Sequence, residues 1–195
     1  FRALYPQSRE AYHQAVTCAR EAGDAGLDGQ LLVGYMHVLS MLGAGAQAQT
    51  LGARADRLLK RAGDLFYLSK LHVSRGNVFY QSDRYADAYD AYRQAERAFT
   101  KLGIRDASWA SVRINQAIAC TNLARIRKAR EIFEEVQAFC DQEGLLVLSA
   151  NARYNRCFLE ALRGDYRLAL SLLDEASPVF AANQVVDMVA ACMRA

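Results

Sequence analysis

The cysteines and histidines are the side chains of this sequence with the richest chemistry. A cysteine nucleophile needs a base within hydrogen-bonding reach, and a metal centre needs several ligands close together. The last histidine is His72, whereas four of the five cysteines lie at Cys120 or later. The sequence contains no Cys-x-x-Cys, no His-Glu-x-x-His and no glycine-rich phosphate loop. It therefore predicts no catalytic residue, no metal site and no cofactor, and hence no enzyme.

The cysteines themselves are better explained as packing residues. Cys120, Cys140 and Cys157 occupy positions that apolar or small residues fill elsewhere in the chain, and a free thiol behaves there as a small hydrophobic group. The five cysteines are odd in number and irregularly spaced, which favours reduced thiols over a disulfide framework. We therefore expect a cytoplasmic protein.

A stripe of amides and aromatics is the stronger signal for binding. Asn115 and Asn155 occupy equivalent places 40 residues apart, and Asn77 lies at the next position of the stripe on an earlier helix. Other polar and aromatic residues share this face at helical spacing. An amide offers both donors and acceptors to the backbone of an extended peptide. An alternative is that Asn115 and Asn155 only pair with each other between adjacent helices. The candidate binding residues are His37, Lys70, Asn77, Tyr80, Asn115, Ile118, Asn122, Tyr154, Asn155 and Phe158.

The elements that must position this stripe are helices. In the stretch Tyr85–Leu102 the apolar residues repeat every three or four positions, which predicts one buried helical face. Candidate helix ends at Gly23, Gly63, Gly103, Gly144 and Asn183 recur every 39 to 41 residues, the signature of stacked repeats. The sequence therefore predicts helices over residues 9–22, 27–42, 46–62, 65–81, 85–102, 109–123, 126–143, 145–162 and 166–182, with caps at Ser8 and at Asp106 or Ser108.

This unit resembles the tetratricopeptide repeat (TPR). Gly76, Phe79, Ala88, Tyr92 and Ala95 match the glycine, aromatic and alanine positions of that motif. The resemblance implies an all-α, right-handed superhelix of antiparallel helix pairs, with the first helix of each pair lining a concave groove. Arg75, Gln116 and Arg156 replace an expected leucine, and Glu160 replaces an expected aromatic. The repeats expected in a single array over residues 1–195 are 1–23 (partial), 27–63, 64–103, 106–144, 145–183 and 184–195 (partial).

Composition limits the kinds of partner. The formal net charge is +3, with basic residues spread along the whole chain, so no block of like charge predicts a nucleic-acid or membrane surface. The longest apolar stretches, such as Leu145–Leu148, fall far short of the roughly 20 residues that span a bilayer. Protein or peptide partners remain, and we expect neither nucleic acid nor membrane binding.

The stretches Asn115–Arg125 and Tyr154–Tyr166 also resemble the TPR regions of bacterial CHAT proteins, in which a caspase-like protease domain follows the repeats. That resemblance implies a fragment of a larger protein, acting as a scaffold or sensor that regulates an attached protease domain. The alternatives are a structural spacer, a self-association element, or the sensor region of a bacterial transcription regulator.

Four further expectations concern details of packing. Pro178 predicts a kink or an early end of its helix. In the first helix the inward residues are expected to be Ala11, Ala15, Cys18, Ala19 and Ala22. Arg113 and Arg153, which recur at the repeat period, are expected to form ion pairs between repeats. Incomplete repeats at both ends predict end-to-end association of the isolated fragment.

Overall fold

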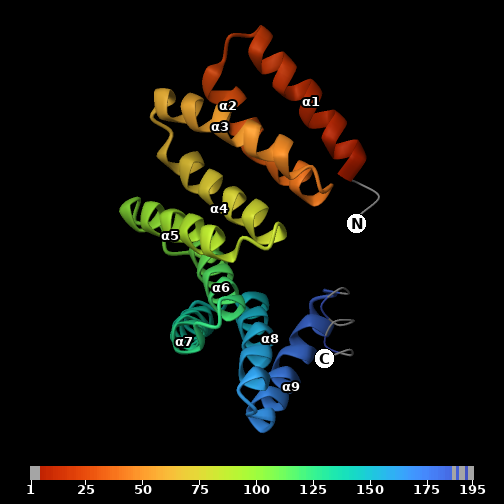
Figure 1. The fold of residues 1–195 in the computed structure, drawn as a ribbon, viewed down its shortest axis with the longest axis vertical. Helices are drawn as coiled ribbons and strands as arrows, with labels where there is room; N and C mark the ends of the chain where they lie inside the picture. The colour runs from red at the N-terminus through yellow and green to blue at the C-terminus, as the bar shows by residue number, and fades with distance from the viewer. Residues whose placement is uncertain (1–4, 186–187, 189–191, 193–195) are drawn as a thin grey trace. The chain divides into compact units, whose positions relative to one another are not determined.

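The computed structural model describes residues 5–185, 188 and 192, and over these residues the secondary structure is entirely helical (Figure 1). Most helices are 17 residues long. Their bounds are α1 (Tyr5–Glu21), α2 (Ala25–Met41), α3 (Gly45–Ala62), α4 (Leu65–Gln81), α5 (Tyr85–Lys101), α6 (Ala107–Asn122), α7 (Ile126–Gln142), α8 (Leu146–Leu162) and α9 (Tyr166–Ala182). The predicted all-α class is confirmed, and most predicted bounds hold to within two residues.

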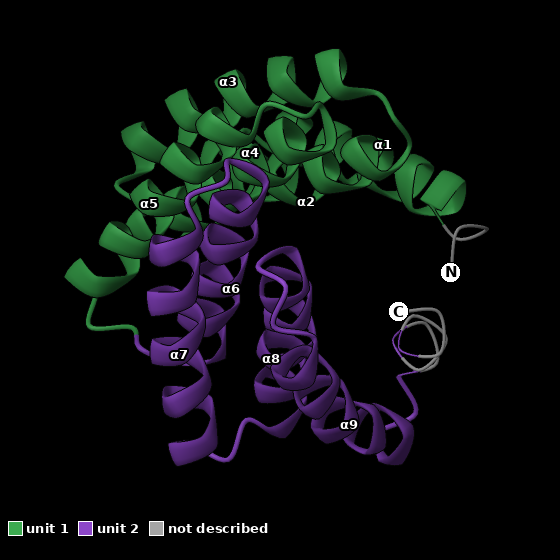
Figure 2. Cartoon of the chain, turned by 60° about the horizontal axis from the view of Figure 1, so that its bottom comes forward, with its two compact units in different colours: residues 1–104 green, residues 105–195 purple. Residues whose placement is uncertain are grey.

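The chain divides into two compact units, residues 1–104 with α1 to α5 and residues 105–195 with α6 to α9 (Figure 2). In the first unit α2 packs on α3 and α4 packs on α5, while α2 also lies beside α4. In the second unit α6 packs on α7, α8 packs on α9, and α6 lies beside α8. Short connections make successive helices antiparallel, so within each unit the first helices of neighbouring pairs lie side by side.

Every helix from α1 to α9 ends in the same turn. The N–H of the residue after the turn donates to the carbonyl five positions earlier, as Asp24 does to Ala19 (3.0 Å) and Arg125 to Cys120 (2.9 Å). This is the Schellman closure, which needs one residue with positive φ. The positive-φ residues follow one another at intervals of 20 or 21 positions, and they are Gly23, Gly43, Gly63, Asp83, Gly103, Ala124, Gly144, Gly164 and Gln184. The predicted end at Asn183 is therefore wrong by one residue, since Asn183 has φ −97 and Gln184 takes the left-handed conformation.

Replacing Ala124 by glycine is expected to stabilise the protein. A left-handed residue with a Cβ is strained, while glycine adds some entropy to the unfolded chain, so Ala124→Gly is expected to raise the free energy of unfolding by about 0.5–1 kcal/mol. The control is Ala138→Gly, at an exposed position inside α7, which is expected to cost about 1 kcal/mol. Urea denaturation checks both variants, and destabilisation by both would contradict the strain at Ala124.

Helix α1 begins earlier than the sequence indicates. It starts at Tyr5, so Ser8 is not its N-cap. Pro6 lies in its first turn, where a missing backbone N–H costs no hydrogen bond. Four later helices are capped by aspartates, and at α6 the cap is Asp106, which accepts from the N–H of Ser108 (2.7 Å).

The predicted inward face of α1 is also wrong in part. Ala11, Cys18 and Ala22 are exposed, and the buried residues are Val16 and Ala19. Tyr12 shares this face, and its ring stacks on Tyr35 of α2 with centroids 6.1 Å apart. The larger apolar side chains, rather than the run of small ones, therefore determine which face of α1 is buried.

Pro178 does not end its helix, because α9 continues to Ala182. Proline loses only its own N–H bond, and the following residues still donate, as Asn183 does to Val179 (3.1 Å). Phe180 is completely buried beyond the proline, in a cluster with Ala176. Burying a phenylalanine contributes about 1.5–3 kcal/mol, which is comparable with the roughly 3 kcal/mol that an internal proline costs.

Each of the first two complete helix pairs packs a glycine of one helix against a large side chain of the other, but the glycine lies on opposite helices in the two pairs. A Cβ on Gly76 of α4 would lie 2.3 Å from the ring of Tyr92 on α5, so the tyrosine occupies the space next to the glycine. Forty residues earlier the order is reversed, and a Cβ on Gly52 of α3 would lie 3.0 Å from Sδ of Met36 on α2. The missing side chain at Gly52 is thus replaced by the side chain of Met36, which keeps the interior filled.

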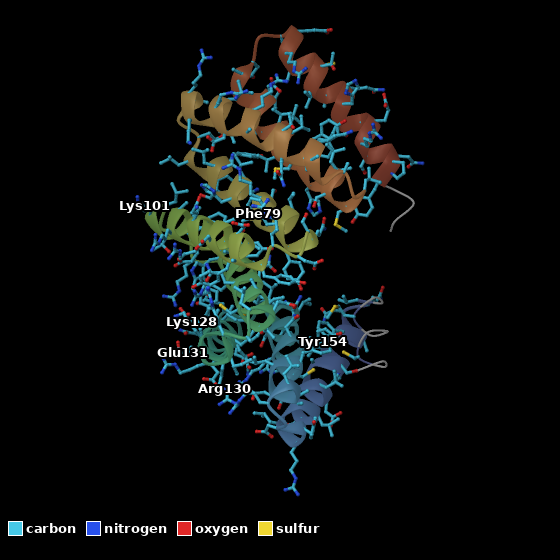
Figure 3. All side chains as sticks on the ribbon, viewed as in Figure 1. Phe79, Lys101, Lys128, Arg130, Glu131 and Tyr154 are labelled. Atoms are coloured by element: carbon cyan, nitrogen blue, oxygen red, sulfur yellow. The ribbon has the colours of Figure 1, made fainter. Side chains whose placement is uncertain are left out.

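The alanines of the second helices are contact points between paired helices. Ala129 on α7 is fully buried, so Ala129→Leu is expected to overpack the interface and cost about 1–3 kcal/mol. Its exposed neighbour Lys128 approaches Glu131 at 3.7 Å, and both lie on the outer side of α7 (Figure 3). Lys128→Leu is expected to cost less than about 0.5 kcal/mol. Equal shifts of the two variants in a thermal melt would contradict this assignment.

The predicted helix over residues 185–193 lies mostly outside the described residues. Of this segment the structure places Val185, Met188 and Cys192, which pack against the cluster of Ala150, Ala176 and Phe180. End-to-end association and the division into one continuous array both stay predictions.

Candidate functional site

In the first unit, the predicted binding residues lie on α2 and α4. His37 is exposed, and Lys70, Asn77 and Tyr80 are half-buried. Asn77 is tied to the partner helix, since its Oδ1 accepts a hydrogen bond from the hydroxyl of Tyr92 (2.8 Å). Burial raises the pKa of Tyr92, so this hydroxyl remains a donor. One acceptor position of Asn77 is thus already used inside the fold.

Lys70 and Tyr80 make their ring contacts within their own unit. The Lys70 Nζ lies 4.5 Å from the centroid of the Phe66 ring and 5.2 Å from that of Tyr67, a cation–π arrangement. Tyr80 packs edge-on against Tyr85, with centroids 5.4 Å apart. Lys70 therefore presents an ammonium group held against aromatic rings at the start of α4.

In the second unit, the predicted residues lie on α6 and α8, which pack side by side. Tyr154 contacts Phe158 and Phe180, with ring centroids 5.0 Å and 6.3 Å apart, and it lies on the side of α8 that faces α9 (Figure 3). Phe158 is 42% exposed, and Ile118 is half-buried. The aromatic part of the stripe therefore combines a packed ring with an accessible one.

The asparagines of this unit do not all have the same environment. The Nδ2 of Asn155 donates to the carbonyl and to the Oδ1 of Asn151 on the same helix (2.8 and 2.6 Å), and Nδ2 of Asn122 donates to the carbonyl of Ile118 (2.9 Å). Asn115 is half-buried, and among the residues that the structure describes its amide makes no hydrogen bond. The alternative pairing of Asn115 with Asn155 is therefore not what the structure shows, and Asn115 is the amide with most bonding capacity left.

Sequence reasoning missed a charged network between α7 and α8. Glu160 is fully buried, and its carboxylate accepts from Arg130 of α7 (2.6 Å), from Arg163 (2.7 Å) and from Arg156 (3.4 Å). Arg156 also pairs with Glu134 of α7 (2.7 Å). These departures from the TPR pattern are thus compensated: arginine and glutamate replace leucine and an aromatic, and their charges neutralise one another. The signal in the sequence was that both unusual residues occur on one helix, four positions apart.

The two recurring arginines behave differently. Arg153 of α8 pairs with Asp141 of α7 (2.9 Å) and with Glu175 of α9 (3.0 Å), so it links neighbouring repeats as predicted. Arg113 of α6 instead pairs with Glu135 of α7, within its own repeat. The prediction of an inter-repeat pair at Arg113 is therefore wrong, because the acidic residue of the paired helix lies within its reach.

The thiols are poorly suited to nucleophilic chemistry. Cys120, Cys140 and Cys157 are buried, and burial raises the pKa of Cys140 and of Cys157 to about 11. The reactive thiolate is therefore scarce at neutral pH. Over the described part of the chain, no group of three or more His, Cys, Asp or Glu side chains could hold a metal ion.

A cavity that the sequence did not indicate lies between α1, α2 and α3. Its volume is about 580 Å³, and its lining mixes apolar and charged side chains, including Arg9, Glu10, His13 and Tyr35.

Over the residues described, no helix is long and apolar enough to cross a membrane.

Helical pairs that close in identical turns, with first helices side by side in each unit, define the class of the fold as an all-α helical repeat of the tetratricopeptide type. The comparisons with known proteins agree. The chain is similar to the crystal structure of BtubC (BKLC) from P. vanneervenii, with a TM-score of 0.74 and 16% identity over 96% of this chain and 87% of that one. It is also 25% identical, over 99 residues, to KINESIN LIGHT CHAIN-RELATED 3 of Arabidopsis thaliana. That match covers 50% of this chain and only 15% of the plant protein. No family model matches the sequence.

Proposed function

We propose that this chain is a protein-interaction module whose first-helix stripe binds an extended segment of a partner protein. The observation that carries the proposal is Asn115, a half-buried amide in the stripe without a hydrogen bond among the described residues. A hydrogen bond contributes about 0.5–1.5 kcal/mol net, and a bound peptide backbone would offer this amide both a donor and an acceptor. Helical-repeat proteins present extended surfaces of this kind, and the similarity to a kinesin light chain-related protein supports an interaction role.

The remaining residues of the stripe have graded roles in this proposal. The accessible ring of Phe158, supported by Tyr154, supplies apolar contact, and aromatic anchors commonly contribute most to such binding. Asn77 and Asn155 each have one internal partner, so they contribute less than Asn115. His37, Lys70, Tyr80, Ile118 and Asn122 are peripheral members of the stripe.

The experiment selects ligands from a random peptide library displayed on phage and measures their affinity by calorimetry. Asn115→Ala is expected to weaken binding by about 1–2 kcal/mol, roughly five- to thirtyfold. The matched control is Asn183→Ala, an exposed asparagine outside the stripe whose amide already bonds to the carbonyl of Val179, and it is expected to change affinity less than twofold. Equal affinities of the wild type and the Asn115 variant, or no selected peptide at all, would refute the proposal.

The finer proposals rest on resemblance. The proposal that this chain controls an attached caspase-like protease domain rests on the resemblance of the stretches Asn115–Arg125 and Tyr154–Tyr166 to CHAT proteins. The rival roles are a structural spacer, a self-association element or the sensor region of a transcription regulator. In this proposal the protein acts in the cytoplasm, since all five of its cysteines are unpaired. A pull-down with the parent protein, followed by a protease assay with and without the selected peptide, distinguishes these roles.

A further inference from the structure

An exposed apolar patch lies where α8 meets α9 at their connecting turn. Its four large residues are Phe158, Leu162, Tyr166 and Leu170, with exposed fractions of 42%, 70%, 66% and 61%. A hollow of about 230 Å³ lies beside them and is lined in part by Cys157, Ala161 and Ala169. Contiguous apolar surface of this kind on a water-soluble unit marks an interaction site. We call these four residues the α8–α9 patch.

The preceding repeat differs at one equivalent position of its second helix. Forty residues before Leu170 stands Arg130 of α7, whose guanidinium pairs with the buried Glu160 of α8. On α9 the same place carries an apolar side chain that is 61% exposed. The arginine on α7 therefore matches the buried carboxylate of α8, whereas the α8–α9 patch suits an apolar partner surface.

Two charged residues flank the patch on α9. Arg167 precedes Leu170 by three positions and Asp174 follows it by four, so both lie on the same side of the helix as Leu170. Both are exposed, and within the part of the chain that the structure describes neither has an ion pair or a hydrogen bond. Arg167 and Asp174 are therefore available to a partner.

The face of α9 around Leu170 is complementary to the same face of a second copy. When two copies of a helix cross antiparallel about a two-fold axis, a residue ahead of the axis meets a residue behind it on the other copy. With the axis near Leu170, Arg167 of one copy faces Asp174 of the other, and the reverse pair forms by symmetry. An unrelated partner would need no such balance of opposite charges around a central leucine.

We propose that the α8–α9 patch is a homodimer interface, in which the α9 helices of two copies pack antiparallel around Leu170. Leu170 and Tyr166 form the apolar centre, while two Arg167–Asp174 pairs at the edges fix the orientation. This interface is centred on Leu170 and Tyr166 of α9, whereas the proposed peptide surface is centred on Asn115 of α6. The two surfaces share Phe158, so peptide affinity measured in a monomeric Leu170 variant distinguishes failure of one proposal from failure of the other.

The experiment is sedimentation velocity of the full chain over a concentration series. A monomer–dimer equilibrium is expected, and Leu170→Asp is expected to raise the dissociation constant roughly tenfold or more, because it buries a charge at the centre of the interface. The matched control is Leu146→Asp, at the start of α8 and outside the patch, where the leucine is 63% exposed. This control is expected to leave the dissociation constant unchanged. Circular dichroism confirms that each variant keeps its helix content.

Charge reversal tests the antiparallel geometry itself. Arg167→Asp and Asp174→Arg are each expected to weaken the dimer, because like charges then face each other across the axis. Mixing the two variants is expected to restore dimers, since each mixed dimer recovers two opposite-charge pairs. A monomer at every concentration, a dimer indifferent to Leu170→Asp, or a mixture as weak as the separate variants would each overturn the proposal. Preserved peptide affinity in a monomeric Leu170 variant would show that the interface and the peptide surface are separate.

Discussion

Gly76→Met is expected to lower the free energy of unfolding by about 3 kcal/mol. The ring of Tyr92 already occupies the space beside Gly76, and even a single Cβ there would approach the ring to 2.3 Å. Tyr92 is 2% exposed and its hydroxyl is bonded to Asn77, so the ring has little freedom to move aside. Chemical denaturation followed by circular dichroism measures the loss.

The pair Met36 and Gly52, in which the large side chain and the glycine lie on the opposite helices, suggests a test of whether Gly76 and Tyr92 share one packing space. Tyr92→Gly alone is expected to cost about 3–5 kcal/mol, because it leaves a cavity in the core. The double variant Gly76→Met/Tyr92→Gly copies the methionine–glycine pair found 40 residues earlier, and is expected to recover at least about 2 kcal/mol relative to the sum of the two single changes. Strict additivity in this double-mutant cycle would show that the two positions do not share one packing space.

Glu160→Gln is expected to destabilise the protein by about 3 kcal/mol. The carboxylate is completely buried and compensates the guanidinium groups of Arg130, Arg156 and Arg163. Glutamine keeps the shape but removes the charge, which leaves these arginines without their shared counter-ion. The arginines are partly exposed, so water relieves some of the cost and holds the expected effect at the lower end for a broken buried pair.

The matched control for Glu160 is Glu134→Gln. Glu134 pairs with Arg156 on the same face of the network, but its side chain is 50% exposed. An exposed pair contributes about 0–1 kcal/mol, so this variant is expected to melt close to the wild type. Similar losses of stability in the two variants would mean that the burial of Glu160 does not determine its contribution to the free energy of unfolding.

The helical periodicity predicted much of the fold. The predicted ranges Leu65–Gln81 and Tyr166–Ala182 agree with α4 and α9, because apolar spacing and turn residues at both ends act locally. The buried face predicted for Tyr85–Leu102 is confirmed for the same reason, since Ala88, Tyr92, Ala95 and Phe99 of α5 are buried. The early end predicted at Pro178 is wrong, since α9 continues to Ala182 and buries Phe180 beyond the proline.

The candidate site was predictable only in part. Residues of one helix share a face by spacing alone, so the members of the stripe on each first helix could be grouped from the sequence. Which asparagine keeps unused bonding capacity depends on contacts between helices and on local rotamers, such as the bond from Tyr92 to Asn77 and the bond from Asn155 to Asn151. Without these contacts, the sequence could not distinguish Asn115 from Asn77 and Asn155 as a binding residue.

The sequence by itself determined that this protein is an all-α repeat of helix pairs with a period close to 40 residues, because helix formation and turn closure depend on residues near one another in the chain. Only the tertiary structure decided how unusual residues are compensated. Met36 fills the space at Gly52, and Arg130 of α7 pairs with Glu160 of α8, across distances in sequence that no local pattern connects. It also decided that Leu170, between Arg167 and Asp174, is exposed and not covered, since exposure depends on what the neighbouring helices leave open.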